Sequence, residues 1–315
     1  MEILSAFISR LMRKFNYLKL KLQELFKTHL PLGYPETAMI EVCSVCNLRC
    51  FLCPAGNSSL GRKPGFMAER TFKKIVDELD DRYIDLFMPV MWGESFLHPK
   101  IMDFLRYARN KNWYIDISTN GNISADDKFY DELVGIGIDG IVCAVDGYDQ
   151  STYSIYRRGG DLGKVYAFLE GIKKAKDKLK LTRPKVVAQI HLFNFNEDHV
   201  ADIKRNLVVL VDEVKTKKTR VFYNDSKVDN QAIASMYNSV RPKIKMNQFE
   251  PPAQTGTKIC TSMLYGVYIA WNGDVIACCG DPSNKLKFGN INEQSLRQIR
   301  NSKRFLNLEK EHLRG

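Results

Sequence analysis

Cysteine is the residue type that points most directly to chemistry in this sequence of 315 residues. Cys46, Cys50 and Cys53 form a C-x3-C-x2-C loop that begins three residues after Cys43. Structural zinc sites usually need four ligands and pair their cysteines as two distant C-x2-C units. Three thiolates on one short loop instead suit three irons of a [4Fe–4S] cluster, and they leave the fourth iron open to a small chelating molecule.

A second group of cysteines lies near the C-terminus and consists of Cys260, Cys278 and Cys279. A chain of this length buries an adequate core without disulfides. Clustering at short spacings therefore indicates metal ligation in a reducing compartment, and we expect a cytoplasmic protein. Cys143 lies in an apolar segment and is expected to be a core thiol, whereas Cys43 is expected to be a free thiol at a strand end.

Composition and charge restrict the class of protein. Hydrophobic residues make up 44% and charged residues 26% of the chain, which is typical of a globular protein and excludes a wholly disordered one. No run of 18 apolar residues occurs, so a membrane-spanning helix is not expected. The formal net charge of +11 favours anionic partners but does not choose among them.

Residues 1–30 show apolar side chains at helical spacing with lysines and arginines between them. Two interpretations stay open. This basic amphipathic helix lies on an anionic membrane surface, which would make the protein membrane-peripheral, or it packs on the main domain and turns its basic face to solvent. Pro31 and Pro35 end the helix, so the N-terminal segment covers residues 1–36.

From Thr37 to residue 224 the chain alternates between strand and helix patterns. Six βα units predict an α/β fold, an open partial (β/α)6 barrel with its helices outside the sheet. Ligands of such sheets bind at the carboxyl ends of the strands. The expected strands cover residues 37–42, 84–91, 114–118, 140–145, 185–193 and 220–223, and the expected helices cover 69–80, 99–110, 126–134, 161–179 and 197–210.

The strand at 185–193 shows which of its faces meets the site. Val186, Ala188 and Ile190 fall on one face, whereas Gln189 and His191 fall on the other. Gln189 and His191 are therefore candidate substrate contacts. The alternative is that they satisfy each other or nearby backbone groups.

The end of the chain departs from the strand–helix alternation. Residues 225–258 are polar, contain three prolines and are expected to be a connector. In the module at 259–315, strands at 267–270 and 274–277 join at Trp271-Asn272-Gly273, and Asn-Gly between alternating runs predicts a β-hairpin. We expect this hairpin, followed by a basic helix, to bring Cys260 towards Cys278.

Five segments together resemble the radical S-adenosylmethionine (radical SAM) superfamily, from about residue 37 to about residue 305. The first is the cysteine loop with its aromatic residue Phe51. The others follow in order at the ends of the next strands and read Gly93-Glu94-Ser95, Ser118-Thr119-Asn120-Gly121, Ala144-Val145-Asp146-Gly147 and Tyr153 to Gly160. Ser95 replaces the usual proline, and Ala144 replaces a serine, which removes one hydrogen bond to SAM.

This resemblance implies a set of cofactor-binding residues. Cys46, Cys50 and Cys53 would hold a [4Fe–4S] cluster whose open iron binds SAM. Gly93 and Glu94 would hold the SAM amino group, and an arginine would meet its carboxylate, a pairing for which a guanidinium is geometrically suited. The remaining cofactor-binding candidates from these motifs are Phe51, Thr119, Asp146, Arg157 and Arg158.

The C-terminal module resembles the SPASM or Twitch extensions that carry auxiliary iron–sulfur clusters. Three cysteines are fewer than either extension uses, and adjacent residues such as Cys278 and Cys279 face opposite sides of a strand. Three interpretations remain. Cys260, Cys278 and Cys279 hold a second cluster with a non-cysteine ligand, a short tail is missing, or the module has kept its fold and lost its cluster.

The resemblance implies reductive cleavage of SAM to methionine and a 5′-deoxyadenosyl radical, which abstracts hydrogen from a substrate. A flavodoxin or ferredoxin would supply the electron. Relatives with this module modify peptides or oxidise and epimerise sugars and aminocyclitols. Because 36 residues are too few for a leader-peptide-binding domain, we expect a carbohydrate or other small-molecule substrate, with a peptide-modifying maturase as the alternative.

A third hypothesis is a non-catalytic zinc or iron–sulfur module that binds nucleic acid, which the charge and the clustered cysteines permit. That hypothesis gives no role to Glu94 or Asp146 and no reason for six βα units. We therefore expect no nucleic-acid partner.

Overall fold

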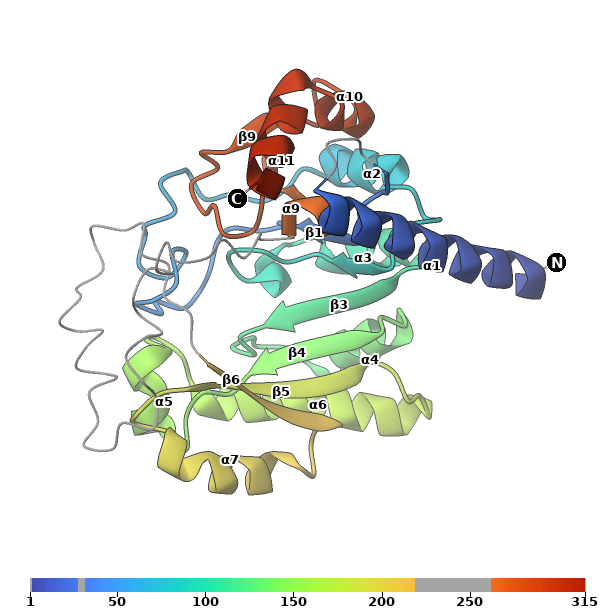
Figure 1. The fold of residues 1–315 in the computed structure, drawn as a ribbon. Helices are drawn as coiled ribbons and strands as arrows, with labels where there is room; N and C mark the ends of the chain where they lie inside the picture. Colours follow the sequence, from blue (N-terminus) through green and yellow to red (C-terminus); the bar gives the residue numbers. More distant parts are fainter. Residues whose placement is uncertain (1, 28–31, 219–261, 315) are drawn as a thin grey trace.

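The computed structural model describes residues 2–27, 32–218 and 262–314. Within these ranges, nine strands form one sheet in the order β6-β5-β4-β3-β2-β1-β7-β8-β9 (Figure 1). Strands β1 to β6 are parallel to their neighbours and follow the order of the chain. They cover Thr37–Ile40, Leu86–Met88, Tyr114–Thr119, Gly140–Ala144, Lys185–Leu192 and Glu213–Lys218. Because β6 and β9 are separate edges, the sheet is open, which confirms the predicted partial barrel.

Helices connect the successive parallel strands. They are α2 (Glu69–Glu78), α3 (Ile101–Arg109), α4 (Asp127–Gly135), α5 (Gln150–Tyr156), α6 (Leu162–Leu179) and α7 (Val200–Leu207), with short 3-10 turns η1 (Ser95–Leu97) and η2 (Glu197–His199). The longest of them, α6, begins at Asp161, whose carboxylate accepts hydrogen bonds from the first-turn amides of Gly163 and Lys164. Its apolar stripe, which includes Phe168 and Ile172, is fully buried. The helix α5 was not predicted, because its seven residues are mostly polar.

The core lies between the sheet and these helices. Phe72 of α2 stacks on Phe104 of α3 with ring centroids 4.1 Å apart, and Phe87 of β2 stacks on Trp113. All four side chains are at most 2% exposed. This packing fixes α2 and α3 against β2, whose carboxyl end leads to Gly93 and Glu94.

The sixth strand lies earlier in the chain than predicted. Strand β6 spans Glu213–Lys218 and pairs in register with β5, whereas the predicted range 220–223 lies outside the described residues. The segment EVKTKK contains one apolar residue, Val214, so it gives almost no hydrophobic signal. A strand at the sheet edge can carry lysines because its side chains need not enter the core.

The C-terminal hairpin is confirmed, and it extends the main sheet. β7 (Gly266–Ile269) pairs with β8 (Asp274–Ile276) in antiparallel register, and β8 pairs with β9 (Lys287–Asn290). At the turn, Gly273 has φ of +89°, a conformation that favours glycine. β7 also pairs with β1 in parallel register, so the hairpin continues the barrel sheet. The short helix α9 (Ser262–Tyr265) precedes it, and α10 (Leu296–Arg300) and α11 (Lys303–Arg314) follow. The predicted connector, 225–258, lies outside the described residues.

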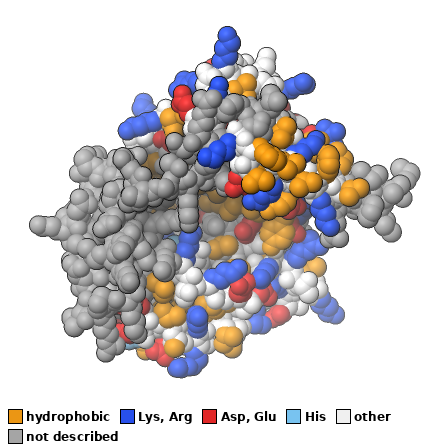
Figure 2. Space-filling model, in the orientation of Figure 1, with side chains coloured by type: hydrophobic (Ala, Val, Ile, Leu, Met, Phe, Trp, Pro, Cys, Tyr) orange, Lys and Arg blue, Asp and Glu red, His pale blue; other side chains and the backbone are white. Residues whose placement is uncertain are grey.

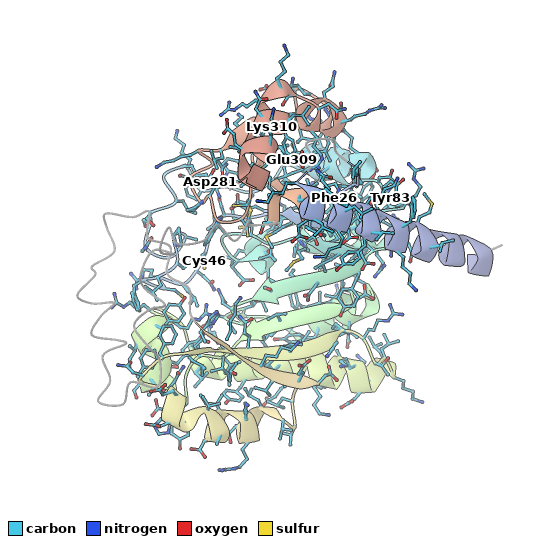
Figure 3. The ribbon with its side chains drawn as sticks, in the orientation of Figure 1. Phe26, Cys46, Tyr83, Asp281, Glu309 and Lys310 are labelled. Atoms are coloured by element: carbon cyan, nitrogen blue, oxygen red, sulfur yellow. The ribbon has the colours of Figure 1, made fainter. Side chains whose placement is uncertain are left out.

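Helix α1 (Glu2–Phe26) packs one face on the rest of the chain, where Asn16 bonds the backbone of Tyr34 ahead of β1 and Glu24 accepts from the hydroxyl of Tyr265 in α9 (Figure 1). Gln23, which is fully buried, donates to Glu309 of α11, and Figure 3 shows Glu309 beside the C-terminal end of α1. The interpretation of a helix packed on the main domain is therefore confirmed for this face. Among the described residues, no helix is both long enough and apolar enough to cross a membrane.

Candidate active site

The cysteine loop follows β1 and is held by its own backbone. Cys53 donates its amide to the carbonyl of Cys50 at 3.1 Å, and Gly56 donates to the carbonyl of Cys53 at 2.8 Å. A Cβ on Gly56 would lie 2.5 Å from the backbone nitrogen and oxygen of Cys50, so the loop can close only with glycine there. These turns place Cys46, Cys50 and Cys53 on one compact loop.

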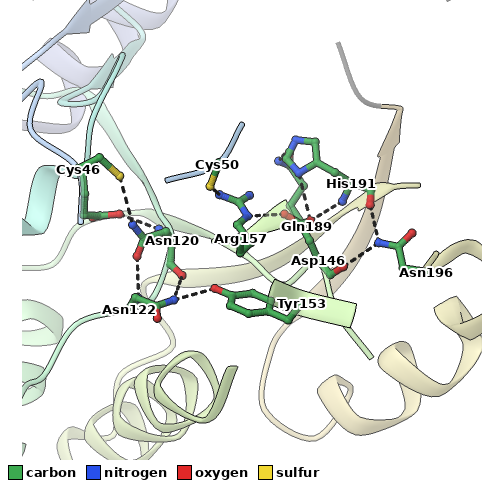
Figure 4. A network of polar contacts seen from close by, with 11 residues as sticks. Cys46, Cys50, Asn120, Asn122, Asp146, Tyr153, Arg157, Gln189, His191 and Asn196 are labelled. Atoms are coloured by element: carbon green, nitrogen blue, oxygen red, sulfur yellow. Dashed lines mark hydrogen bonds and ion pairs between the residues drawn. The ribbon is translucent and has the colours of Figure 1, made fainter. Parts of the chain in front are cut away.

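Hydrogen-bond donors of the protein point at two of the three sulfurs (Figure 4). Sγ of Cys46 accepts from the Leu48 amide at 3.5 Å and from Nδ2 of Asn120 at 3.8 Å. Sγ of Cys50 accepts from Nη1 of Arg157 at 3.8 Å. Such N–H donors suit cluster-ligating thiolates, so this donor set fits a [4Fe–4S] cluster. Burial raises the pKa of Cys46 to about 12 and that of Cys50 to about 11, so iron would be needed to keep them deprotonated.

The described residues contain no group of three Cys, His, Asp or Glu side chains that converges on a single metal ion. An iron–sulfur cube makes a different demand. Each thiolate binds its own iron, so the three sulfurs need not meet at one point.

Glu94 links the ends of β2 and β3. It is 2% exposed, and its Oε2 accepts from the Asn120 amide at 2.7 Å. Its Oε1 accepts from the Thr119 hydroxyl at 3.0 Å and from the Phe96 amide at 3.2 Å. Burial raises the pKa of Glu94, which its hydrogen-bond donors partly offset. The carboxylate thus positions the two strand ends that the sequence predicted to contact SAM, including Thr119.

Gly93 permits this arrangement. Its φ is +88°, and a Cβ there would lie 2.5 Å from the carbonyl oxygen of Cys43. Only glycine lets the second strand end pass so close to the segment that leads into the cysteine loop. The amide of Glu94 also donates to the carbonyl of Val45 at 2.9 Å, which ties the two segments together.

Asp146 and Arg157 form the charged centre of the site. Asp146 follows β4 and is fully buried, and its Oδ2 accepts from Nε of Arg157 at 2.6 Å. Arg157 lies at the C-terminal end of α5 and is 12% exposed. Although burial alone would raise the pKa of Asp146, the charge of Arg157 and the bonds from His191 hold it well below its usual range. The pair is therefore ionised and locks α5 onto the end of β4.

Gln189 and His191 lie together on β5 and reach the same centre (Figure 4). The His191 amide donates to Oδ1 of Asp146 at 2.7 Å, and Nδ1 of the ring lies 3.2 Å from the same oxygen. Nε2 of the ring lies 3.4 Å from Nε2 of Gln189. Both side chains are half-buried, whereas Val186, Ala188 and Ile190 are at most 2% exposed, so Gln189 and His191 share a face, and their role as substrate contacts stays a prediction.

The two candidate arginines have different surroundings. Arg157 points into the site, towards Asp146 and Cys50. Arg158 is exposed and lies over the ring of Phe51, with its guanidinium carbon 5.1 Å from the ring centroid. Phe51 also contacts Tyr156 edge to face, so it supports the cysteine loop from outside.

Two polar residues that sequence reasoning missed, Asn122 and Asn196, complete the network. Nδ2 of Asn122 donates to the hydroxyl of Tyr153 at 2.7 Å, and the Asn122 amide donates to Oδ1 of Asn120. Asn196 is fully buried and donates to the carbonyls of Asp146 and His191, both at 2.8 Å. Asn122 directly follows the motif Ser118-Thr119-Asn120-Gly121, so its position after the third strand was the available signal.

The structure describes only part of the second cysteine group. Cys278 and Cys279 follow β8 and are half-buried, and Sγ of Cys278 accepts from the Gly280 amide at 3.3 Å. Cys260 lies outside the described residues. The segment that follows the cysteine loop meets this region, because Nε of Arg62 donates to the carbonyl of Pro282 at 2.7 Å. The three interpretations of this group stay predictions.

Family comparison decides the class of protein. Residues 40–207, which run from the last residue of β1 through β5 to the end of α7, match the family model of the radical SAM superfamily. The chain belongs to that superfamily. Residues 260–314 match the SPASM model, an iron–sulfur cluster-binding domain. A radical SAM enzyme uses a [4Fe–4S] cluster and SAM, and the second domain indicates further iron–sulfur binding.

A curated relative of this radical SAM enzyme aligns with most of the chain. A curated protein of Pyrococcus furiosus, the tungsten-containing aldehyde ferredoxin oxidoreductase cofactor-modifying protein, is 25% identical over 297 residues, which cover 84% of this chain and 81% of that protein.

Crystal structures share the fold at lower identity. BtrN in complex with AdoMet and 2-DOIA is 18% identical, with a TM-score of 0.55 and coverage of 90% of this chain and 89% of that one. The peptide-bound anSMEcpe with AdoMet is 16% identical, with a TM-score of 0.61 and coverage of 88% and 84%. Streptococcus suis SuiB bound to S-adenosylmethionine is 13% identical, with a TM-score of 0.57 and coverage of 90% and 70%.

Proposed function

We propose that this radical SAM enzyme abstracts a hydrogen atom from a small polar molecule, of the carbohydrate or aminocyclitol class, bound beside Gln189 and His191. The overall reaction would be an oxidation or an epimerisation. When bound, the cluster and SAM supply a 5′-deoxyadenosyl radical that removes the hydrogen, and a second cluster would take up the remaining electron of an oxidation.

The chain's own residues would hold these groups. Cys46, Cys50 and Cys53 would ligate the cluster. Gly93 with the Glu94 segment would face the amino group of SAM. The second terminal nitrogen of Arg157, which neither Asp146 nor Cys50 engages, would meet the carboxylate.

One observation carries the proposal: a continuous chain of contacts runs from a cysteine ligand to the candidate substrate residues. Arg157 contacts Cys50 at one end of its guanidinium and Asp146 at the other, and Asp146 contacts His191, which lies beside Gln189 (Figure 4). The substrate-facing residues are thus fixed at a set position relative to the cluster loop. Abstraction chemistry requires that kind of fixed placement.

His191 is suited to hold a proton from a substrate hydroxyl. Nδ1 faces the Asp146 carboxylate, so in the neutral ring Nδ1 would donate to that carboxylate and Nε2 would be available as an acceptor. The 3.4 Å contact between Nε2 and Gln189 is long for a hydrogen bond, so a substrate hydroxyl can replace it. The Gln189 amide would then bond a second hydroxyl. This pair of polar groups favours a hydroxylated small molecule.

The relatives support both substrate classes. BtrN was crystallised with 2-DOIA, and the Pyrococcus furiosus relative is described as cofactor-modifying, whereas anSMEcpe and SuiB were crystallised with peptides. A peptide substrate therefore remains the alternative. Because the identities to these structures are under 25%, the residues at the site carry the preference for a small molecule.

Deuterium transfer tests the proposal. The reconstituted, reduced enzyme would be incubated with SAM and either deuterated sugars and aminocyclitols or deuterated peptides. We expect deuterium in 5′-deoxyadenosine from a member of the first group, and its loss in the His191→Gln variant when the substrate is limiting. Deuterium transfer from peptides alone would overturn the small-molecule assignment. SAM cleavage without deuterium transfer from either group would contradict the substrate assignment but not the radical SAM chemistry.

A further inference from the structure

Helix α1 packs on the protein with the buried side chains of Asn16, Leu20 and Gln23, of which Leu20 alone is apolar, and it turns a row of apolar side chains outward. Asn16 and Gln23 are at most 3% exposed, and Asn16 exchanges hydrogen bonds with the backbone of Tyr34 at 2.7 and 2.8 Å. Arg13 bonds Asp85 and the Asn112 carbonyl. Surface helices of globular proteins usually show the reverse polarity. The inner face is therefore fixed by specific polar contacts beside the buried Leu20, and the apolar outer face is left exposed.

The outer face is a continuous apolar stripe, which we call the α1 stripe. Its members recur at intervals of four, three, four and three residues and lie on one side of the helix. Their exposed fractions are 59% for Leu11, 60% for Phe15, 52% for Leu18, 37% for Leu22 and 74% for Leu25. Figure 2 shows hydrophobic side chains gathered along this helix with lysine and arginine among them. A contiguous exposed stripe of this kind marks an interaction surface.

Lysines border the α1 stripe on both sides. Lys14 and Lys21, seven residues apart, follow one border, and Lys19 follows the other with its Nζ 4.9 Å from the centroid of the Phe15 ring. The one acidic residue between Leu11 and Lys27 is Glu24, which is turned towards Lys21 and the Tyr265 hydroxyl. The exposed side of this part of α1 is thus apolar in the middle and positive along its edges.

We propose that α1 docks this enzyme on anionic lipid bilayers, with the stripe inserted at the interface and the lysines at the lipid phosphates. A helix with an apolar face and flanking lysines lies in the interfacial plane of a membrane. The fixed inner face holds α1 along the surface of the protein, which is the orientation this binding needs. A second copy of the chain is the less suitable occupant, because pairing two stripes would bring their lysine borders together.

Vesicle sedimentation of the reconstituted full chain tests this docking. The vesicles would contain phosphatidylcholine alone or phosphatidylcholine with phosphatidylglycerol. We expect binding to the anionic vesicles that weakens with added salt, and little binding to the neutral ones. Leu18→Glu/Leu22→Glu should weaken binding by about tenfold or more. The matched control Val208→Glu/Val209→Glu adds the same charge at valines of 65% and 67% exposure and should bind as wild type does.

A second pair of variants tests the basic border separately. Lys14→Gln/Lys19→Gln should reduce binding to anionic vesicles, whereas Lys164→Gln/Lys204→Gln, which removes the same charge at exposed lysines of α6 and α7, should not. Equal binding to both vesicle types, or equal loss in the two lysine variants, would overturn the proposal. So would a dimer in sedimentation equilibrium that Leu18→Glu/Leu22→Glu converts to a monomer without any vesicle binding. Near-ultraviolet circular dichroism confirms that each variant is folded.

Discussion

Nε of Arg157 lies 2.6 Å from Oδ2 of the fully buried Asp146, while Nη1 of the same guanidinium lies 3.8 Å from Sγ of Cys50. One arginine therefore connects the end of β4, the helix α5 and the cysteine loop. Because the pair is buried, its charges are screened little by solvent. The geometry of the loop and the geometry of the substrate face depend on this one contact.

Asp146→Asn should destabilise the protein strongly, because it leaves the Arg157 charge buried without its partner. A loss of about 3–5 kcal/mol in the free energy of unfolding is expected for breaking a buried pair. Asp85→Asn is the control, since Asp85 pairs with Arg13 but is 68% exposed, and it should cost no more than about 1 kcal/mol. Urea denaturation of the two variants measures both values. Similar losses in the two variants would show that the buried pair contributes no more to the free energy of unfolding than the exposed pair does.

Low pH should remove the stability that the Asp146–Arg157 pair contributes. Asp146 has a pKa held well below its usual range in the folded protein, so its contribution to stability is complete above its unfolded-state pKa of about 3.9. That contribution is lost as the pH falls below this value. The difference in unfolding free energy between wild type and Asp146→Asn should therefore shrink as the pH is lowered through this range.

Gly93→Ala should destabilise the site region more than Gly137→Ala does. Both glycines have positive φ, +88° and +78°, so both alanines carry the backbone cost of about 1–2 kcal/mol. A Cβ at Gly137 meets nothing within 4 Å, whereas one at Gly93 would lie 2.5 Å from the Cys43 carbonyl. We expect Gly93→Ala to cost about 1–3 kcal/mol more in urea denaturation. Equal costs would contradict the close approach of the two segments.

His98 makes stability depend on pH near neutrality. Its ring is 4% exposed, with Nε2 2.9 Å from the Met67 carbonyl and Nδ1 accepting from the Lys100 amide. Burial, with the nearby Lys100 charge, lowers the pKa of His98, so the folded state disfavours the protonated ring. Stability should fall as the pH drops below the unfolded-state pKa of about 6.5.

Two variants check that assignment by thermal unfolding between pH 7.5 and about pH 5.5. His98→Gln should be less stable but have a flatter pH dependence. His199→Gln, at a ring that is 45% exposed, should keep the wild-type profile. A profile unchanged in His98→Gln would assign the pH dependence to another group.

His191→Gln tests the proposed proton-holding role separately from folding. Turnover of the hydroxylated substrate should fall by about 10²-fold or more, because a positioned acid–base group contributes that much. Uncoupled cleavage of SAM in the absence of substrate should persist, since His191 does not contact the cysteines. A merely structural role would reduce both rates together. The His199→Gln variant serves again as the matched control.

The sequence predicted most of the parallel sheet because the buried strands carry strong apolar signals. It also predicted the hairpin, where Asn272-Gly273 defines the turn, and it correctly paired Gln189 with His191 on one face. Strand β6 was misplaced because a lysine-rich edge strand has no such signal. The parallel pairing of β7 with β1 joins segments more than 200 residues apart, and no local spacing encodes that contact.

The residues of the site also divide into those that the sequence displayed and those that it did not. Cys46, Glu94 and Asp146 stand in motifs that the sequence displays directly. Asn196 was missed because a lone asparagine in a polar turn resembles many others. Its role appears only in the folded chain, where the turn after β5 lets its side chain donate to the carbonyl of Asp146. The outward direction of the apolar stripe of α1 was also hidden, because spacing alone does not say which face of a helix is buried.

The most direct test of the central claim is formation of 5′-deoxyadenosine from SAM by the reduced, anaerobically reconstituted enzyme. The account predicts SAM cleavage by wild type and by Cys143→Ala, whose thiol is fully buried in the core, and none by Cys46→Ala/Cys50→Ala/Cys53→Ala. The triple variant should also lose about four irons per chain relative to wild type. Cleavage that survives in the triple variant, or a wild type that carries iron and sulfide but leaves SAM intact, would contradict it.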